Sequence, residues 1–318
     1  MPKWTKTPSA PVRIAFVLFD SFSNLCLANC LEPLRAANTL GGRAAFAWQI
    51  LTPGGAAVHS SSGLQVLPHG ALSELSAADY VFVLSSYDYE RHDGPETRRA
   101  LVRAAARADT MVGLDAGPWL MAAAGLLDGR RATVHWDLID DFAETFLEVR
   151  AERAHHLRDG PVMTCAGAMA ALDLTLETIS AHLGTAMRLD VEALFIHGEP
   201  PVGAPGEAEG ARDPMVRRAL ALMREHLERP LPLATLARRL SCQPRTLDRR
   251  FRAGLGAPPG RVYRHLRLAA ARRLIAETRL GIAEVAVRCG YDSPAALARA
   301  VRREYGRSPR ALRAARSA

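Results

Sequence analysis

The sequence lacks the features of a membrane or secreted protein. Its 318 residues contain no apolar run close to the ~18–20 residues that a bilayer span requires, and residues 1–11 lack the apolar core of a secretory signal. The five cysteines are odd in number and scattered, which excludes a closed disulfide framework and predicts a reduced, cytoplasmic setting. A membrane protein, a secreted scaffold and a coiled coil are therefore set aside, and no membrane partner is expected.

The composition is that of a folded chain with two domains. With 48% hydrophobic and 23% charged residues the chain can bury real cores, and its length favours two domains. A stretch rich in Gly, Pro and Glu begins at Gly198 and has little to bury, as is typical of a flexible linker. We predict an N-terminal domain at 1–197, a linker at 198–213 and a C-terminal domain at 214–318.

Charge is distributed unevenly between these domains. Residues 214–318 hold 24 basic residues, all Arg, against 7 acidic ones, so their net charge is +17, whereas the rest of the chain carries −9. A solvated surface usually mixes both signs, so the asymmetry predicts a polyanionic partner for the C-terminal domain. A coding bias towards arginine is an alternative, but it does not explain why the excess stops at the domain boundary.

The C-terminal domain contains one helical motif twice. The sequence Leu-Ala-Thr-Leu-Ala-Arg-Arg-Leu at 233–240 matches Ile-Ala-Glu-Val-Ala-Val-Arg-Cys at 282–289, and a second helix with apolar residues at i, i+4 and i+8 follows each copy. A short helix, a tight break and a second helix form the helix-turn-helix pattern. Residues 261–277 are predicted to form a single helix that connects the two copies.

Small residues and prolines support this assignment. Ala237 and Ala286 occupy the matching position at which the two helices of each motif must cross closely. Gly290 suits the positive φ that such a turn often requires. Pro244 and Pro294 are expected at the starts of the second helices, where a missing N–H costs nothing.

Two longer motifs relate this domain to a known family. Ile-Ala-Glu-Val-Ala-Val-Arg-Cys-Gly-Tyr-Asp-Ser-Pro at 282–294 and Tyr-Gly-Arg-Ser-Pro at 305–309 resemble the signature of AraC/XylS transcription regulators, and the resemblance spans residues 230–313. It implies that two recognition helices enter successive major grooves of double-stranded DNA, on the order of 34 Å apart. It also implies a homodimer formed through the N-terminal domain, activation rather than repression, and RNA polymerase as a candidate partner.

The family's base-reading positions flank the core Leu of each second helix. In the first motif they carry arginines, which can bind guanine bidentately, and an aspartate, which can accept from cytosine N4. In the second motif they are mostly alanine, so we predict that the first helix reads bases and the second mainly anchors phosphates. The predicted DNA-binding residues are Arg245, Thr246, Asp248 and Arg249, then Ser293, Ala295, Ala298, Arg299, Arg302 and Arg303.

Strand and helix patterns alternate in the N-terminal domain. Residues 12–19 form a continuous apolar run, as expected of a buried parallel strand. The alternation predicts an α/β domain with a doubly wound, flavodoxin-like parallel sheet and a pocket at the C-terminal ends of its strands. Further strands are expected at 47–52, 80–84 and 110–114, and helices at 24–38, 94–108 and 117–126.

Two stretches relate this domain to a second family. The segment 112–136, which begins Val-Gly-Leu-Asp-Ala-Gly-Pro-Trp, and the block at 163–173 resemble the class I glutamine amidotransferase-like fold of the PfpI type, over residues 12–197. Enzymes of that family place a nucleophilic Cys at a strand-to-helix elbow, where this chain has Asp115. A carboxylate cannot supply a thiolate, so we predict that the chain is not an enzyme.

A pocket without a nucleophile suits a ligand sensor. A buried carboxylate attracts ammonium groups, Trp faces add cation–π attraction of roughly 0.5–2 kcal/mol each, and N–H groups at the start of the helix after Cys165 can hold a carboxylate. We expect a small cationic or zwitterionic nitrogen-containing effector, with no cofactor and no metal ion. The candidate ligand-binding residues are Glu32, Asp115, Trp119, His135, Trp136 and Cys165.

Other interpretations stay open at this point. The chain as a whole has two alternatives to a regulator: a PfpI-like hydrolase or amidotransferase tethered to DNA, and a structural DNA binder without sequence preference. Either Trp is also compatible with core packing, and Asp115 with capping its helix. Cys26 and Cys30 lie at i, i+4 without a local His or Cys pair, so they are expected to be small core residues rather than metal ligands.

Overall fold

The computed structural model describes residues 3–195 and 213–314, and these divide into two compact units. The sensor unit, named for the ligand sensor that the sequence predicts, comprises residues 7–182, and the helical unit comprises residues 3–6, 183–195 and 213–314. Residues 3–6 and 183–195 thus pack with the C-terminal helices, whereas the composition predicts that they belong to the N-terminal domain. The predicted linker lies outside the described residues, apart from Asp213.

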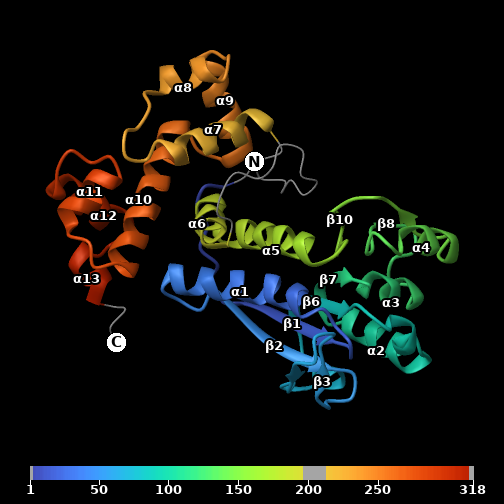
Figure 1. Ribbon diagram of the computed structural model, residues 1–318. Helices are drawn as coiled ribbons and strands as arrows, with labels where there is room; N and C mark the ends of the chain where they lie inside the picture. Colours follow the sequence, from blue (N-terminus) through green and yellow to red (C-terminus); the bar gives the residue numbers. More distant parts are fainter. Residues whose placement is uncertain (1–2, 196–212, 315–318) are drawn as a thin grey trace. The chain divides into compact units, whose positions relative to one another are not determined.

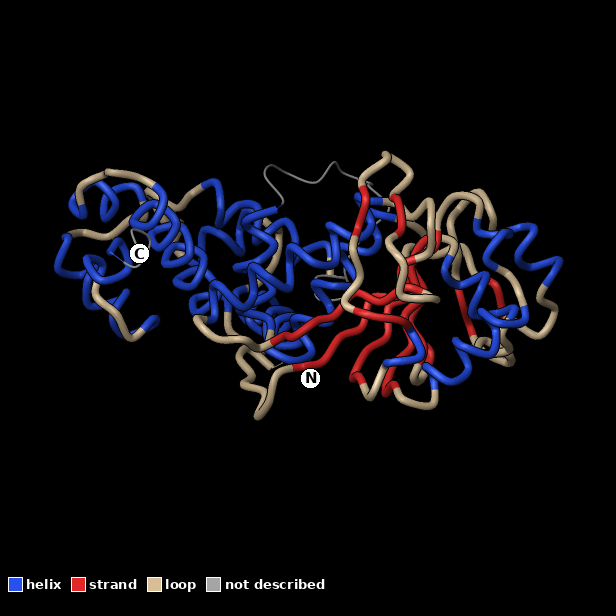
Figure 2. Tube along the Cα trace, turned by 90° about the horizontal axis from the view of Figure 1, so that it is seen from below, coloured by secondary structure: helices blue, strands red, loops and turns tan. Residues whose placement is uncertain are grey.

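The sensor unit is built on a seven-stranded sheet with the strand order β10-β11-β7-β6-β1-β2-β5. All neighbouring strands are parallel except β10 and β11, which confirms the predicted parallel-sheet α/β fold (Figures 1 and 2). Two short pairs, β3 with β4 and β8 with β9, lie outside this sheet. The strands are β1 (Val12–Leu18), β2 (Phe46–Thr52), β3 (Val58–His59), β4 (Gln65–Val66), β5 (Gly70–Ala71), β6 (Ala78–Ser85), β7 (Ala108–Asp115), β8 (Arg131–Ala132), β9 (Arg150–Ala151), β10 (His156–Asp159) and β11 (Val162–Cys165).

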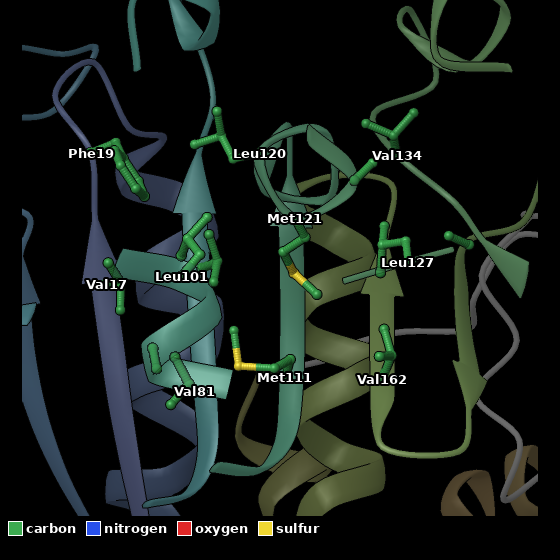
Figure 3. Packing of buried hydrophobic residues seen from close by; sticks show 14 of the residues in the cluster. Val17, Phe19, Val81, Leu101, Met111, Leu120, Met121, Leu127, Val134 and Val162 are labelled. Carbon is green, nitrogen blue, oxygen red and sulfur yellow. The ribbon is translucent and has the colours of Figure 1, made fainter. Parts of the chain in front are cut away.

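Buried side chains join this sheet to its helices. Val17, Val81 and Met111, from three adjacent parallel strands, pack with Leu101 and Met121 from the helices α2 and α3 (Figure 3). Burial on both faces explains why the strands read as continuous apolar runs. The helices of this unit are α1 (Asn24–Gly41), α2 (Pro95–Ala105), α3 (Gly117–Ala123), α4 (Ile139–Thr145) and α5 (Ala168–Leu183), with short 3-10 turns η1 (Leu72–Glu74) and η2 (Tyr89–His92).

The helical unit has two hydrophobic cores that share the long helix α10. The first core includes Val262 and Leu266 of α10, and the second begins with Leu268 and Ala271 of the same helix. In the described part of the chain, no helix is long and apolar enough to cross a membrane. The helices of this unit are α6 (Thr185–Phe195), α7 (Pro214–Glu225), α8 (Leu233–Arg239), α9 (Pro244–Leu255), α10 (Pro259–Glu277), α11 (Ile282–Arg288), α12 (Pro294–Tyr305) and α13 (Pro309–Ala314).

The turn of each helix pair contains a residue in the left-handed region. The φ of Ser241 is 53° and that of Gly290 is 68°, so the positive φ predicted for Gly290 is confirmed. Gly290 has a second constraint, since a Cβ there would lie 2.6 Å from the carbonyl oxygen of Leu227. The helices α9 and α12 begin at Pro244 and Pro294, as predicted.

We expect Gly290→Ala to destabilise the helical unit more than Gly306→Ala does. Both glycines have a φ of 68°, which strains an L side chain by about 1–3 kcal/mol. Only at Gly290 does the new Cβ also meet backbone atoms, because nothing lies within 4 Å of it at Gly306. Urea unfolding of the two variants measures the difference, and equal losses of unfolding free energy would contradict the proposed close approach to Leu227.

Candidate functional site

Helix α9 carries the first candidate nucleic-acid surface. Leu247, Phe251 and Leu255 are at most 1% exposed and pack into the first core. Because these residues recur every fourth position, the opposite face of α9 points to solvent. Arg245 and Arg249 are exposed there, so two guanidinium groups are presented on one side of the helix.

Helix α12 repeats this plan in the second motif. Leu297 and Val301 are fully buried in the second core. Arg299, Arg302 and Arg303 are exposed. The N-terminal turn carries alanine where α9 has arginine, so α12 offers fewer groups that can hydrogen-bond a base edge.

Two of the predicted DNA-binding side chains already have partners within their own helix. Asp248 lies 2.7 Å from Arg252 in an i, i+4 ion pair. The Ser293 hydroxyl accepts a hydrogen bond from the Ala296 N–H at 3.2 Å and caps α12. Thr246 is half-buried. Arg245, Arg249 and the arginines of α12 therefore remain the principal candidates for contacts with DNA.

Some arginines of this unit are structural, which the charge count could not reveal. Arg267 donates to the carbonyl oxygen of Cys289 at 2.8 Å, and its guanidinium lies 4.4 Å from the centroid of the Tyr291 ring. Arg313 donates to the carbonyl oxygen of Leu280 at 2.6 Å. These contacts link separate segments of the second motif to one another. Because such arginines are already engaged, the net charge of the domain overstates the charge that faces a partner.

In the sensor unit, Asp115 is the last residue of β7, directly before the turn into α3. Its φ is 61°, in the left-handed region, and it is 8% exposed. Ser86 donates a hydrogen bond to its carboxylate at 2.7 Å. Burial raises the pKa of Asp115, although the Ser86 hydrogen bond and the nearby His135 oppose this shift. Gly117 permits the tight turn, since a Cβ there would overlap the carbonyl oxygen of Val83.

Three thiols lie in the interior of the same unit. Cys26, Cys30 and Cys165 are 0% exposed. Burial raises the pKa of each thiol, that of Cys165 to about 12. Since the thiolate is the nucleophilic form, these protonated and buried groups pack as small core residues, as the sequence predicts for Cys26 and Cys30.

A cavity of about 510 Å³ lies where the loop after β8 meets the start of α5. Its lining combines the basic side chain Arg153 and two histidines, His135 and His155, with apolar groups, and includes no carboxylate among the described residues. Trp136 lines it while 66% exposed, and Met169 at the beginning of α5 is 64% exposed. The site therefore offers a flat aromatic surface next to groups that attract an anion.

Neighbouring groups control the charge of this cavity. Arg153 Nη2 lies 2.6 Å from Asp140 Oδ1, and both side chains are largely exposed, so the pair is screened by solvent. The pKa of His155 is lowered by burial and by the adjacent His156, which favours its neutral form at physiological pH. Arg153 therefore carries a positive charge in the cavity lining that does not depend on pH, and Asp140 compensates part of it.

The structure places the predicted ligand residues as follows. His135 and Trp136 both line the cavity, and their rings are tilted by 36° with centroids 5.0 Å apart. Cys165 is buried immediately before the lining residues Ala166 and Gly167. Asp115 is linked to His135 through the hydrogen bond that the His135 N–H donates to its carbonyl oxygen, at 2.9 Å, but it does not line the cavity.

The remaining two predicted residues have other partners. Trp119 is half-buried and packs against the core, with its ring centroid 5.1 Å from that of Phe146. Glu32 pairs with Arg35 on the surface of α1 at 2.8 Å. The cavity therefore does not unite Asp115, Trp119 and Trp136, because α3 turns Trp119 towards aromatic residues near α4.

Within residues 3–195 and 213–314, no group of three or more His, Cys, Asp or Glu side chains is placed to hold a metal ion.

Known proteins match both parts of the chain. Residues 12–181 match the DJ-1/PfpI family, and residues 236–315 match a helix-turn-helix domain. The chain is 34% identical to the HTH-type transcriptional regulator GlxA of Rhizobium meliloti, over 95% of both chains. It is 32% identical to the HTH-type transcriptional regulator CdhR of Pseudomonas aeruginosa, over 92% of this chain and 89% of that protein.

Solved structures share the α/β fold. A crystal structure of an AraC family transcriptional regulator from Pseudomonas putida matches 58% of this chain and 100% of its own, with 24% identity and a TM-score of 0.53. A ThiJ/PfpI family protein from Pseudomonas syringae matches 68% and 87%, with 22% identity and the same TM-score. The double helix-turn-helix unit, the parallel-sheet domain and the full-length relatives agree: the chain belongs to the AraC family of transcriptional regulators that carry an N-terminal DJ-1/PfpI domain.

Proposed function

We propose that α9 and α12 bind a specific DNA sequence and that the cavity of the sensor unit binds the small molecule that controls this binding. The observation that carries the proposal is the pair of arginine-bearing helices, each buried on its apolar face and joined by one connector, α10. A protein that only coats DNA needs positive charge but no such paired helices. The proposal includes a cytoplasmic homodimer, transcriptional activation and RNA polymerase as a partner.

Base reading is assigned mainly to α9. Arg245 and Arg249 are exposed on the face opposite its buried side chains, and an arginine in the major groove can bind guanine O6 and N7 bidentately. Asp248 pairs with Arg252, so it needs to release that partner before it can accept from a cytosine. Arg299, Arg302 and Arg303 of α12 are assigned to phosphates, which position the protein without reading sequence.

The effector is proposed to be a small zwitterion with a carboxylate and an ammonium group. Arg153 and the N–H groups at the start of α5 suit the carboxylate. The exposed face of Trp136 suits the ammonium group through cation–π attraction. This assignment moves recognition of the cation from Asp115, as the sequence suggested, to Trp136. Binding controls DNA recognition only if it favours one arrangement of the chain over another.

The sensor unit is proposed to have no hydrolase or amidotransferase activity. The elbow residue Asp115 is a buried carboxylate with a raised pKa, and the thiols nearest to it are buried and protonated. Neither group is a competent nucleophile in this state. A buried Asp at the elbow is compatible with a fold that has kept the geometry of the turn without the chemistry.

Arg249→Ala should weaken binding to a specific duplex by about 1–3 kcal/mol and leave binding to random DNA nearly unchanged. Arg303→Ala should weaken both and reduce the slope of log affinity against log salt by about one unit. Fluorescence anisotropy measures both effects, on a duplex selected from a random library by the full-length protein. Equal losses on specific and random DNA for Arg249→Ala would exclude it as a base reader.

A zwitterion that binds in the cavity should raise the unfolding free energy of the sensor unit by about 2.7 kcal/mol when its free concentration is 100 times its Kd. We expect a thermal-shift screen of amino acids, betaines and small amines to find its hits among compounds that carry both charges. Trp136→Ala should abolish the shift, while the matched variant Trp48→Ala, on β2, should retain it. Hits that are purely cationic and unaffected by Trp136→Ala would contradict this assignment.

Asp115→Asn should raise the melting temperature at pH 8 by about 2–4 °C, the range expected for ~1 kcal/mol in a unit of this size. The folded-state pKa of Asp115 lies above its unfolded value, because burial disfavours the ionised carboxylate. The protonated carboxyl therefore contributes to the unfolding free energy in full at low pH, and this contribution is lost as the pH rises through the folded-state pKa. The advantage of the variant should therefore shrink at pH 4. Detectable glutamine or peptide hydrolysis that this substitution removes would instead support an enzyme.

A further inference from the structure

Two stretches outside the helix-turn-helix motifs belong to the helical unit. Residues 3–6 run alongside the start of α6, where the N–H groups of Thr185 and Ala186 donate to the carbonyl oxygens of Lys3 and Trp4 at 3.0 and 2.9 Å. Gly184 precedes α6 with a φ of 89°, and a Cβ there would lie 2.7 Å from Thr5 Cα. We call residues 3–6 and α6 together the brace.

The side chain of Trp4 anchors residues 3–6 of the brace in the first core. It is 5% exposed and packs in one cluster with Ala186 and Leu189 of α6 and with buried residues of α7, α8, α9 and α10. Its ring meets the imidazole of His265 edge-on, with centroids 5.1 Å apart, and the guanidinium of Arg261 lies 5.7 Å from its ring centroid. The brace is thus anchored on α10 by a large buried aromatic side chain.

His265 connects the brace to both motifs. It lies on α10, 5% exposed, with Nε2 2.8 Å from Asp190 Oδ1 of α6 and Nδ1 3.4 Å from Glu304 Oε1 of α12. Burial alone would lower the pKa of His265, but the two carboxylates outweigh it and raise the pKa to about 9. The imidazolium therefore forms ion pairs with two helices at neutral pH.

The position of His265 along α10 is the critical one. The first core ends on α10 at Leu266 and the second begins at Leu268, so His265 lies where the two cores meet. Figure 1 shows α10 running from the group α7–α9 to the group α11–α13. The brace also contacts α7, because Glu192 Oε1 of α6 lies 3.5 Å from Arg224 Nη2 of α7. It therefore contacts the first motif, the connector and, through His265 and Glu304, the second motif.

From this geometry we infer that the brace sets the position of α12 relative to α9 and so determines the spacing of base pairs that the chain accepts. Asp190 and Trp4 are positioning residues for DNA recognition: they act on the connector and touch no DNA in this assignment. The inference rests on the proposed DNA-reading role of α9 and α12. It adds that the structure which holds the two helices in register lies partly outside the motifs themselves.

The chain connectivity gives this brace a regulatory consequence. Helix α6 follows α5 after the single residue Gly184, and residue 6 directly precedes the sensor unit. Both stretches of the brace are therefore covalently continuous with the unit that contains the proposed effector cavity. In this inference, a conformational change in the sensor unit that displaces residues 3–6 or α6 alters the spacing between α9 and α12. Effector and DNA then need no direct contact.

The test starts from a duplex that the full-length wild-type protein selects from a random library. This duplex is compared with the same duplex carrying one extra base pair between its two subsites, which are the segments contacted by α9 and by α12 of one chain. The insertion moves one subsite by about 3.4 Å along the axis, so the wild type should lose about 10-fold or more in affinity, as for a mismatched site. In full-length Asp190→Asn and Trp4→Ala the loss should shrink to less than about 3-fold. A variant that is merely less folded binds both duplexes more weakly by the same factor, so the ratio isolates positioning from stability.

Matched substitutions in the sensor unit serve as controls. Asp79→Asn removes a carboxylate that pairs with Arg13 at 3.6 Å, and Trp48→Ala removes a half-buried indole from β2. Both should keep the wild-type ratio. If the brace variants also keep it, or if the wild type tolerates the inserted base pair, the inference is overturned while DNA reading stands. If the wild-type protein selects no duplex, the proposed function falls and the inference with it.

Discussion

The two helix-turn-helix motifs, with the proposed recognition helices α9 and α12, share one connector, α10. Each motif has its own hydrophobic core, and the two cores meet on α10 between Leu266 and Leu268. One helix can hold two rigid bodies in register only if its junction is reinforced. At that junction His265 forms a buried ion pair with Asp190 and a longer one with the exposed Glu304. A buried ion pair contributes little net stability, which agrees with the inferred role of the His265–Asp190 pair in positioning the two motifs.

The sensor unit combines a tight strand-to-helix turn at Asp115 with a cavity whose lining includes Arg153 and two histidines. The turn at Asp115 keeps a left-handed residue and the glycine that a close strand-to-helix approach requires. The carboxylate is buried and hydrogen-bonded to Ser86, and the nearby thiols are inaccessible. The open, aromatic and basic cavity lies beside this turn, linked to it through His135. The elbow residue Asp115 and the proposed ligand cavity are therefore separate in this chain.

Local patterns predicted the elements well and the contacts poorly. The strand runs at 12–19 and 110–114, the connector near 261–277 and the prolines that begin α9 and α12 all correspond to observed elements, because they depend on residues a few positions apart. Trp119 and Trp136 share a short stretch of sequence, yet one packs against the core and the other is exposed. The charge count likewise did not separate Arg267, which binds backbone carbonyls, from Arg249 on the exposed face of α9.

The sequence by itself determined the two folds, the duplicated motif and the family, since periodicity, turn residues and repeated spacing are encoded locally. Only the tertiary structure decided which side chains line a cavity, which arginines are already engaged, and that residues 3–6 and α6 join the DNA-binding helices. The physical reason is that burial and ion pairing depend on distances between segments far apart in the chain. Trp4 and His265 are separated by more than 250 residues, and no local pattern in either segment predicts that their rings meet.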